Sequence, residues 1–322
     1  MDFEIVGVYT YDADSIVIAH YEANEYTIAY VSDNNTIYSQ SVTYGQPYKL
    51  YNPNDKENYE FCCWRDAMVD GAQLSDGIFE FDYNIVLYAT WTKILTISLE
   101  TGCSYTVDKT VQKVYVIGNY TGLPDSIMSD IGITISMRDS DLTLCLINAG
   151  FKGRENCAAI DCENSSYTLM VLLSGDSYIE GGKGSDGING KSGSKMTASN
   201  CNGTDGQNGG CALNCGTVIF ENKEKNSSLH LVGGSGGNGG NGGVDKDRSR
   251  MWLNYCPNGG SSGNSASALH CVAYSINGTT VTFEKGEAGE AGKAGSRGDW
   301  WCSACYGSDG KKGKQLDVVS YK

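Results

Sequence analysis

Short segments in which apolar and polar positions alternate run along most of the chain. The alternation has a period of two residues and its apolar places are rich in β-branched and aromatic side chains, so these segments predict β-strands. Gly, Asp and Asn separate them, as expected of tight turns. The predicted strands lie at 26–30, 41–44, 59–64, 85–91, 114–117, 131–137, 142–146, 167–173, 228–232 and 280–283. The pattern therefore predicts a mainly β chain.

Two stretches near the N-terminus repeat each other. Residues 16–21 (IVIAHY) match residues 86–91 (VLYATW), and each is followed by a second apolar alternation. The unit between them contains YTIAYVSDNN, SVTYGQPYKL, YEFCCWRD and DYNIVLYATWTK, in that order. Over residues 26–93 this order resembles the Listeria–Bacteroides repeat, also called the internalin-B-type B-repeat. The resemblance implies a small β-grasp-like module that serves as a spacer or binding unit in secreted surface proteins, without catalysis.

Residues 1–25 resemble the tail of a preceding repeat. The chain also starts with MDFEIV, which has neither the basic nor the apolar region of a secretory signal. Together these features predict a fragment of a longer surface protein. One departure from the family pattern is Cys63, which stands where the family has Gly before Trp64. Because cysteine tolerates a positive φ poorly, the family's turn conformation is not carried over to this position.

The C-terminal half repeats more loosely. The pattern A-[IL]-x-C occurs at residues 159–162, 212–215 and 268–271. In a strand the second and fourth residues of this pattern share one face, so we expect the Ile/Leu and Cys side chains to stack inward. The strand rhythm of residues 101–280 resembles clostridial carbohydrate-binding parallel β-helix domains. That resemblance implies a β-solenoid that binds sugars.

Glycine recurs at every third position in tracts at 184–193, 203–209, 233–243, 286–298 and 307–313. Three residues per turn is the period of the polyproline II helix, which has no internal hydrogen bonds. A bare glycine edge lets neighbouring helices approach and bond laterally, as buried backbone groups must. The tracts therefore predict an intramolecular bundle of polyglycine-II helices. Flexible linkers and an intermolecular collagen-like trimer are the alternatives.

Composition narrows the classes of function. The chain has 42 Gly but only 4 Pro among 322 residues, unlike collagen. Its formal net charge of −14 excludes nucleic-acid binding through a basic footprint and leaves no polybasic face for anionic membranes. No apolar run is long enough to span a bilayer. With 3 His and neither a G-x-S-x-G nor an H-E-x-x-H motif, the sequence predicts no catalysis. A polysaccharide lyase or hydrolase on a β-helix is the enzymatic alternative.

The 13 cysteines favour an oxidising, extracellular compartment. A ladder of inward thiols, either free or bridged, is predicted for Cys145, Cys162, Cys215 and Cys271. One local disulfide is expected among Cys201, Cys211 and Cys215. Cys302 and Cys305 have C-x-x-C spacing, but without a second pair they favour a structural disulfide over zinc.

No cofactor is predicted. Asp186, Asp205 and Asp309 lie in the glycine tracts and have the oxygen ligands that calcium prefers, so calcium is the one cofactor alternative. The nonapeptide calcium-binding pattern fits no tract. Solvated Asp side chains are therefore the expectation.

Five aromatic residues cluster at the ends of the tracts: Trp252, Tyr255, Trp300, Trp301 and Tyr306. Exposed aromatic faces can stack on sugar rings, so these five form the candidate ligand-binding site. The alternative is that they cap the bundle and cover its glycine edges.

The sequence therefore predicts an adhesin-like fragment of a microbial protein that is secreted or attached to the cell wall. We expect the tail of a truncated B-repeat at 1–25, a full B-repeat at 26–96, β-solenoid rungs at 97–175 and a glycine-rich region with interleaved strands at 176–322. The expected partner is a polysaccharide, or a glycan or protein of a cell surface, and the fragment is expected to be a monomer. A purely structural stalk without a ligand is the alternative.

Overall fold

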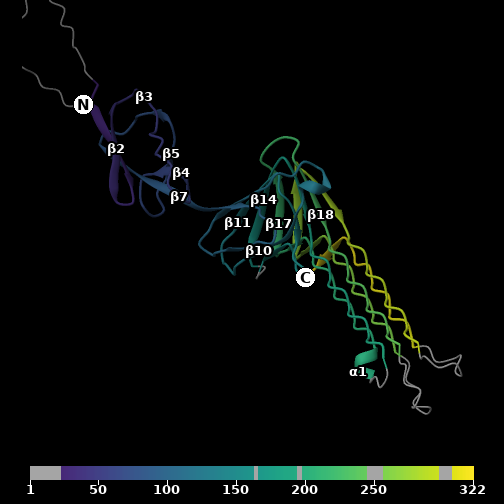
Figure 1. Cartoon of the computed structure of the whole chain (residues 1–322). Coiled ribbons are helices and arrows are strands. Elements are labelled where there is room, and N and C mark those ends of the chain that lie inside the picture. Colours follow the sequence, from purple (N-terminus) through teal and green to yellow (C-terminus); the bar gives the residue numbers. More distant parts are fainter. Residues whose placement is uncertain (1–22, 163–165, 194–197, 245–256, 297–306) are drawn as a thin grey trace, which may run out of the picture. The chain divides into compact units, whose positions relative to one another are not determined.

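A computed structural model of the chain describes residues 23–162, 166–193, 198–244, 257–296 and 307–322. These residues are mainly β-strand, with a 3-10 helix, η1 (Pro124–Ser126), and a four-residue helix, α1 (Ala198–Cys201). The chain divides into two compact units, Met1–Lys93 and Ile94–Lys322 (Figure 1). Strand β7 (Ile85–Ser98) contributes its first half to the first unit and its second half to the second. No helix among the described residues is long and apolar enough to cross a membrane.

The first unit is a small mixed sheet. Strands β1 (Glu25–Ser32) and β2 (Asn35–Thr43) form an antiparallel hairpin. Asp33 and Asn34 close it at φ values of 49° and 65°, as a two-residue hairpin turn requires. Strand β7 runs parallel to β1 and antiparallel to β4 (Tyr59–Arg65). The remaining strands are β3 (Pro47–Tyr48), β5 (Gln73–Leu74) and β6 (Gly77–Ile78).

Aromatic side chains fill the core of the first unit. Tyr30 and Trp64 are buried, and their ring centroids lie 4.8 Å apart. Trp64 Nε1 donates to the Tyr51 carbonyl oxygen at 2.6 Å, so the buried indole is satisfied. Cys63 lies within β4, beside a register shift between Phe61 and Cys63, and not at a positive-φ turn. The extra residue of this bulge is Cys62, and Cys63 pairs with Thr90 as an ordinary strand residue.

The second unit is built from three ladders of parallel strands. The first ladder contains the second half of β7, β9 (Lys113–Ile117), β11 (Leu142–Ile147), β14 (Thr168–Ser174), β17 (Thr217–Asn222) and β20 (Ala273–Asn277). The second contains β10 (Met128–Ile135), β12 (Gly150–Gly153), β15 (Asp176–Glu180), β18 (Ser228–Val232) and β21 (Thr280–Glu284). The third contains β8 (Ser104–Val107), the end of β10, β13 (Ile160–Cys162), β16 (Leu213–Asn214), β19 (Leu269–Cys271) and β22 (Val319–Tyr321).

Alternate side chains of the ladders point into a common core. In the first ladder Leu144, Val171 and Phe220 are register partners on adjacent strands, and all three are buried. The A-[IL]-x-C pattern forms β13, β16 and β19 of the third ladder, with its Ile/Leu and Cys positions buried in the same core. The inward Ile/Leu–Cys face expected from the sequence is therefore confirmed.

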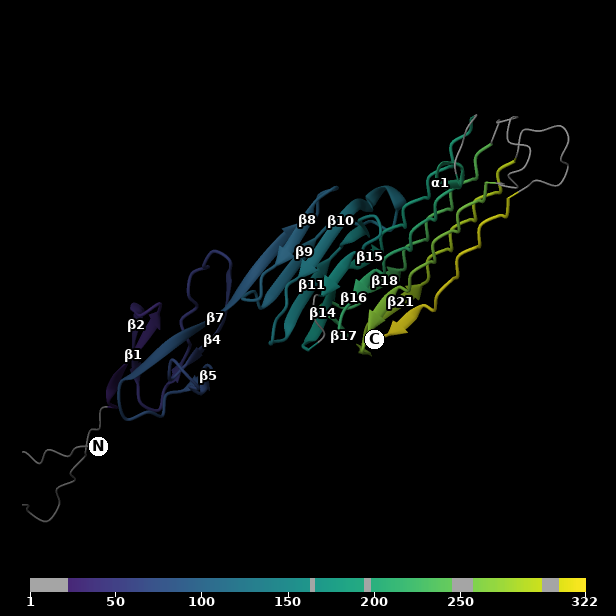
Figure 2. The same cartoon turned by 90° about the horizontal axis from the view of Figure 1, so that it is seen from below.

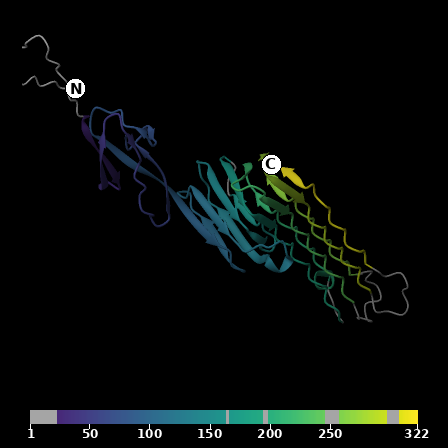
Figure 3. The ribbon, with the colours of Figure 1, turned by 90° about the horizontal axis from the view of Figure 1, so that it is seen from above.

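Between the second and third ladders the chain leaves the sheets as extended glycine-rich segments, which we call threads. They are thread 1 (181–193), thread 2 (202–211), thread 3 (233–244), thread 4 (257–268), thread 5 (285–296) and thread 6 (307–318). Threads 1, 3 and 5 lead away from the strands and threads 2, 4 and 6 return to them (Figures 1 and 2). Seen from above, the threads lie side by side along their whole length (Figure 3). The helix α1 follows thread 1, where no helix was expected.

Candidate functional site

The threads are hydrogen-bonded to one another along their length. Gly184 N donates to Ser235 O at 2.7 Å, and equivalent bonds recur every three residues between threads 1 and 3. Threads 3 and 5 are joined in the same way, as are threads 2, 4 and 6. Bonds between the two sets run antiparallel, as where Gly237 N donates to Gln207 O at 2.8 Å. The threads thus satisfy their N–H groups through their neighbours, because such extended helices have no internal bonds.

Glycine is required where a thread has neighbours. A Cβ atom on Gly240 would lie 2.1 Å from Ile188 O of thread 1, and one on Gly239 would lie 1.9 Å from Gly260 O of thread 4. Thread 3 packs against threads on both sides and carries two glycines in each triplet. Threads 1 and 5, at the two sides of this layer, carry mostly one. In the layer of threads 1, 3 and 5, the number of glycines in a triplet therefore follows the number of neighbouring threads. In thread 4, the middle thread of the other layer, the buried Ser262 and Ser265 take the place of a second glycine.

In threads 1 to 4, most triplets also supply a side-chain acceptor for a backbone N–H of the next thread. Asp186 Oδ1 accepts a hydrogen bond from Asn238 N, and Asn238 Oδ1 accepts one from Glu290 N, both at 2.8 Å. Asp205 Oδ1 accepts from Ser261 N in the other set of threads. The Asn238 N–H, assisted by Lys183, holds the pKa of Asp186 below its usual value. The sequence predicted solvated side chains for these aspartates. In the structure, each of them also accepts a hydrogen bond from a backbone N–H of the next thread.

The thread ends farthest from the strands are aligned, and we call them the distal end. Gly193 N donates to Val244 O, Gly243 N to Cys201 O and Gly295 N to Pro257 O, at 2.7–2.9 Å. The described residues that flank the connections between threads 1 and 2, 3 and 4, and 5 and 6 therefore all lie at this end.

The five aromatic residues predicted to bind a ligand lie outside the described residues. Trp252 and Tyr255 belong to 245–256, between threads 3 and 4. Trp300, Trp301 and Tyr306 belong to 297–306, between threads 5 and 6. The described residues that flank these two segments lie together at the distal end.

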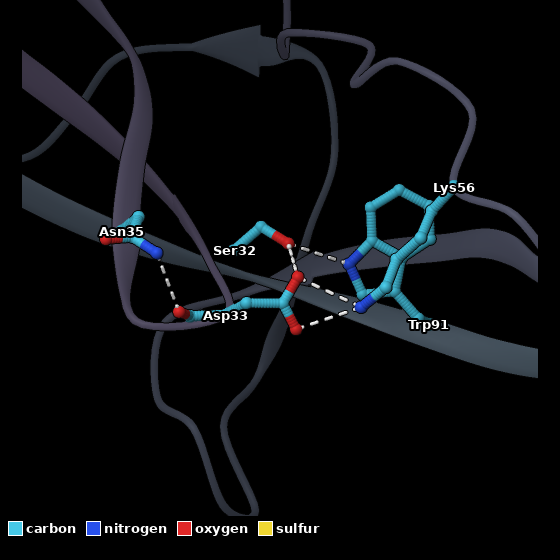
Figure 4. Close-up of polar contacts among 5 residues, drawn as sticks. All are labelled: Ser32, Asp33, Asn35, Lys56 and Trp91. Atoms are coloured by element: carbon cyan, nitrogen blue, oxygen red, sulfur yellow. Dashed lines mark hydrogen bonds and ion pairs between the residues drawn. The ribbon is translucent and has the colours of Figure 1, made fainter.

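A polar cluster in the first unit was not predicted from the sequence (Figure 4). Lys56 Nζ lies 2.9 Å from both carboxylate oxygens of Asp33 and also 5.7 Å from the centre of the Trp91 ring. Trp91 Nε1 donates to Ser32 Oγ at 3.0 Å, and Asn35 Nδ2 donates to the Asp33 carbonyl oxygen. The Lys56 ammonium lowers the pKa of Asp33. These contacts hold the loop that carries Lys56 against the β1–β2 turn. The cluster therefore stabilises the fold of the first unit.

A second polar group lies on the outer face of the second ladder. The Tyr178 and His230 rings meet edge to face with centroids 5.4 Å apart, and His230 Nε2 lies 3.2 Å from Glu284 Oε2. Tyr178 Oη donates to Glu180 Oε2 at 2.8 Å, and Lys152 Nζ lies 2.7 Å from the same oxygen. Burial, followed by the Glu180 carboxylate, raises the pKa of Tyr178. The groups satisfy one another across adjacent strands, so this row stabilises the ladder.

The expected local disulfide is wrong: Cys211 and Cys215 are free thiols, so neither bridges to Cys201. Cys201 ends helix α1, directly before thread 2, and Cys211 ends thread 2. Ten residues at about 3.1 Å each put the two cysteines some 30 Å apart, far beyond disulfide reach. Of the predicted ladder, Cys162, Cys215 and Cys271 line the core as free thiols. Cys145 is also buried but lies in the first ladder, in register with Tyr115 and Leu172, and is not part of it.

Burial raises the pKa of Cys162 to about 11 and that of Cys211 to about 12. These thiols are therefore protonated at neutral pH and poor nucleophiles. Cys302 and Cys305 fall outside the described residues. Where the structure describes side chains, no three His, Cys, Asp or Glu residues gather as a metal site would need. His230 and His270 lie on different strands, β18 and β19, as predicted.

No protein-family model matches the chain, and no curated protein matches it.

Proposed function

We propose that the chain is part of a secreted or wall-attached microbial surface protein that binds glycans, or a host or neighbouring-cell surface, as an adhesin does. The distal end of the thread bundle is the binding end, and the first unit is a spacer. The observation that carries this proposal is the shared register of the threads, which brings the described residues that flank three connecting segments to one end. Two of those segments contain the five candidate aromatic residues.

The second unit is, in this proposal, a β-solenoid whose coils extend into polyglycine-II helices. Its strands stack in parallel, and in the second ladder Tyr178, His230 and Thr282 are successive register partners. The lateral hydrogen bonds between threads are those that polyglycine-II helices require. Because contacts between threads demand glycine and short polar residues, the connecting segments are where side chains can vary without disturbing the packing. A recognition surface belongs at such positions.

The first unit is proposed to be a Listeria–Bacteroides repeat. Its hairpin β1–β2, the strand β4 that ends in CCWR and the closing strand β7 follow the order of the family motifs. The tryptophan of the aromatic motif, Trp64, packs on Tyr30 in the core. A small module that is stabilised by a buried aromatic core can serve as a spacer.

A glycan array probed with the purified chain tests the proposal. The native chain is expected to bind a defined set of glycans, and Trp300→Ala with Trp301→Ala is expected to lower that binding at least tenfold. The matched control is Tyr83→Ala, which removes an aromatic ring 58% exposed in the first unit and leaves binding unchanged.

Three results would contradict the proposal. Binding that survives the double substitution would move the site away from the distal end. No binding to glycans or to cells at high concentration would favour the purely structural stalk. Reducing ends or unsaturated products released from uronate polymers would favour the polysaccharide-degrading alternative.

A further inference from the structure

Asparagine is followed by glycine at six places in the threads. Thread 1 contains one such pair, threads 2 and 3 contain two each and thread 4 contains one: Asn189–Gly190, Asn202–Gly203, Asn208–Gly209, Asn238–Gly239, Asn241–Gly242 and Asn258–Gly259. In an unfolded chain this dipeptide is prone to deamidation, because glycine has no Cβ atom to hinder the approach of its nitrogen to the asparagine side chain. The threads therefore contain six chemically labile sites.

The packing of the threads requires both residues of each pair. A Cβ atom on Gly190 would lie 1.8 Å from Cys201 O, and one on Gly239 would lie 1.9 Å from Gly260 O. The asparagine side chain supplies the acceptor for a backbone N–H of the next thread. The contacts that build the bundle thus place glycine directly after asparagine.

Each pair is bonded at two points to a single residue of the next thread. Asn238 Oδ1 accepts a hydrogen bond from Glu290 N, and Gly239 N donates one to Glu290 O, both at 2.8 Å. The same arrangement recurs at the other five pairs, at 2.7–3.0 Å, and their partner residues are Asn241, Asn258, Asn264, Lys293 and Ser308. In every pair, the glycine nitrogen and the side-chain carbonyl group are therefore both bonded to one partner residue.

This arrangement opposes the reaction between the two residues of a pair. Ring closure requires a base to remove the proton of the glycine N–H, and that N–H is bonded to a carbonyl oxygen of the next thread. The bond to the asparagine Oδ1 would by itself polarise the side-chain carbonyl group and favour attack. Protection therefore depends on the glycine N–H, which has to leave its partner before it can lose its proton. The same opening controls the hydrogen exchange of that amide.

We propose that the six pairs are latent deamidation sites, which the assembled bundle keeps unreactive. When a thread separates from its neighbour, the deprotonated glycine nitrogen attacks Cγ of the asparagine. The Cγ–Nδ2 bond breaks, ammonia leaves, and a succinimide ring remains that contains the glycine nitrogen. Water then opens the ring at either of its carbonyl groups and gives aspartate or isoaspartate.

The isoaspartate product does not fit the bundle. It runs the main chain through Cβ and adds one atom to it, so the glycines that follow lose the three-residue register of the thread. Aspartate itself is accepted at such a position, since Asp186 Oδ1 receives Asn238 N in the same way as the asparagines do. A chain that forms isoaspartate before its threads assemble is therefore expected to lose the bundle, so that folding has to precede the reaction.

The rate of deamidation in the full chain tests the proposal. The native chain and the same chain in guanidinium chloride are incubated at pH 8, and peptide mass spectrometry after digestion at acidic pH measures each asparagine. All six thread pairs are expected to react at least a hundredfold more slowly in the native chain. The internal reference is a seventh pair, Asn277–Gly278, which follows from β20 into an exposed turn. The Asn277 side chain donates to Glu221 Oε1, but no hydrogen bond joins Gly278 N to another described residue. In the native chain this pair is expected to react at least tenfold faster than any thread pair.

A variant tests whether thread packing is the cause. Gly240→Ala is expected to raise the rates at Asn238 and Asn241 at least tenfold, because it loosens thread 3, whereas the matched control Ile188→Ala changes an exposed side chain of thread 1 and leaves every rate unchanged. Thread pairs that react in the native chain within threefold of their rate in guanidinium chloride would overturn the proposal. A native Asn277 as slow as the thread pairs would also overturn it. The comparison of native and denatured chains needs neither a variant that folds nor a glycan, so it fails independently of the binding proposed for the distal end.

Discussion

At the scale of single residues, each place in a thread triplet has its own steric requirement. Gly240 of thread 3 packs against thread 1, while the corresponding place in thread 1 holds Ile188, whose side chain is 75% exposed. The same register position therefore demands glycine inside the bundle and accepts a β-branched residue at its side. Glycine is required at Gly240 because of the neighbouring carbonyl oxygen, and not because of the backbone conformation.

Gly240→Ala is expected to destabilise the second unit by about 3 kcal/mol, at the upper end of what overpacking costs. The reason is that the new Cβ would lie 2.1 Å from Ile188 O, a backbone atom that cannot rotate away. Denaturant unfolding of the two variants measures the effect. Ile188→Ala serves as the control at the corresponding position of thread 1 and should change stability little. Equal effects at the two positions would contradict the packing of thread 3 between neighbours.

A pH dependence is predicted for Asp186. Its pKa in the folded chain is lowered, so the stability it contributes is present above its unfolded pKa of about 4 and is lost as the pH falls further. Asp186→Asn keeps an oxygen that accepts from Asn238 N but does not titrate. The difference in melting temperature between native and variant chains should therefore change below about pH 4 in favour of the variant. A difference that is constant from pH 7 to pH 2 would contradict the contact.

At the scale of elements, the sequence predicted strands where apolar and polar positions alternate clearly, including four-residue strands at 114–117 and 280–283. Strands such as β4 and β11 carry several alternating apolar side chains, and the motifs of the proposed B-repeat locate β1 and β7. Strands β15 and β17 were missed because each buries only two side chains, and β20 was missed because it buries none.

The candidate site could be located only in part. Period-three glycine predicted the threads, but which N–H each short polar residue satisfies depends on a thread 52 or 56 residues away. The Asp33–Lys56 contact also had no signal in the sequence, since Lys56 lies in a loop without a motif. Partners that meet only through tertiary packing leave no local pattern.

The core thiols give a prediction at this scale. Under native conditions at pH 8, iodoacetamide should label the exposed Cys62 and Cys157 and spare Cys162, Cys215 and Cys271, because burial hides these three and raises their pKa values. Peptide mass spectrometry reads each site. Labelling in urea, which should modify all five, is the control. Rapid native labelling of Cys215 would contradict the inward ladder.

At the scale of the whole second unit, the strands and the threads are stabilised by different interactions. The ladders bury a continuous apolar core that includes Leu144, Phe220 and Leu231. The threads bury almost no apolar side chains and depend on backbone hydrogen bonds and short polar acceptors. In our proposal this arrangement holds variable segments at the distal end on a support whose own sequence is tightly constrained.

The most direct test of the account is hydrogen–deuterium exchange of the thread amides, resolved by peptide, on the native chain. The account predicts that thread 3, whose glycine N–H groups donate to threads 2 and 5, exchanges orders of magnitude more slowly than an unstructured chain. The exposed turn at Asn226, which has φ of 67°, provides the fast internal reference. Thread amides that exchange as fast as that turn would show that the glycine tracts are linkers and would contradict the bundle.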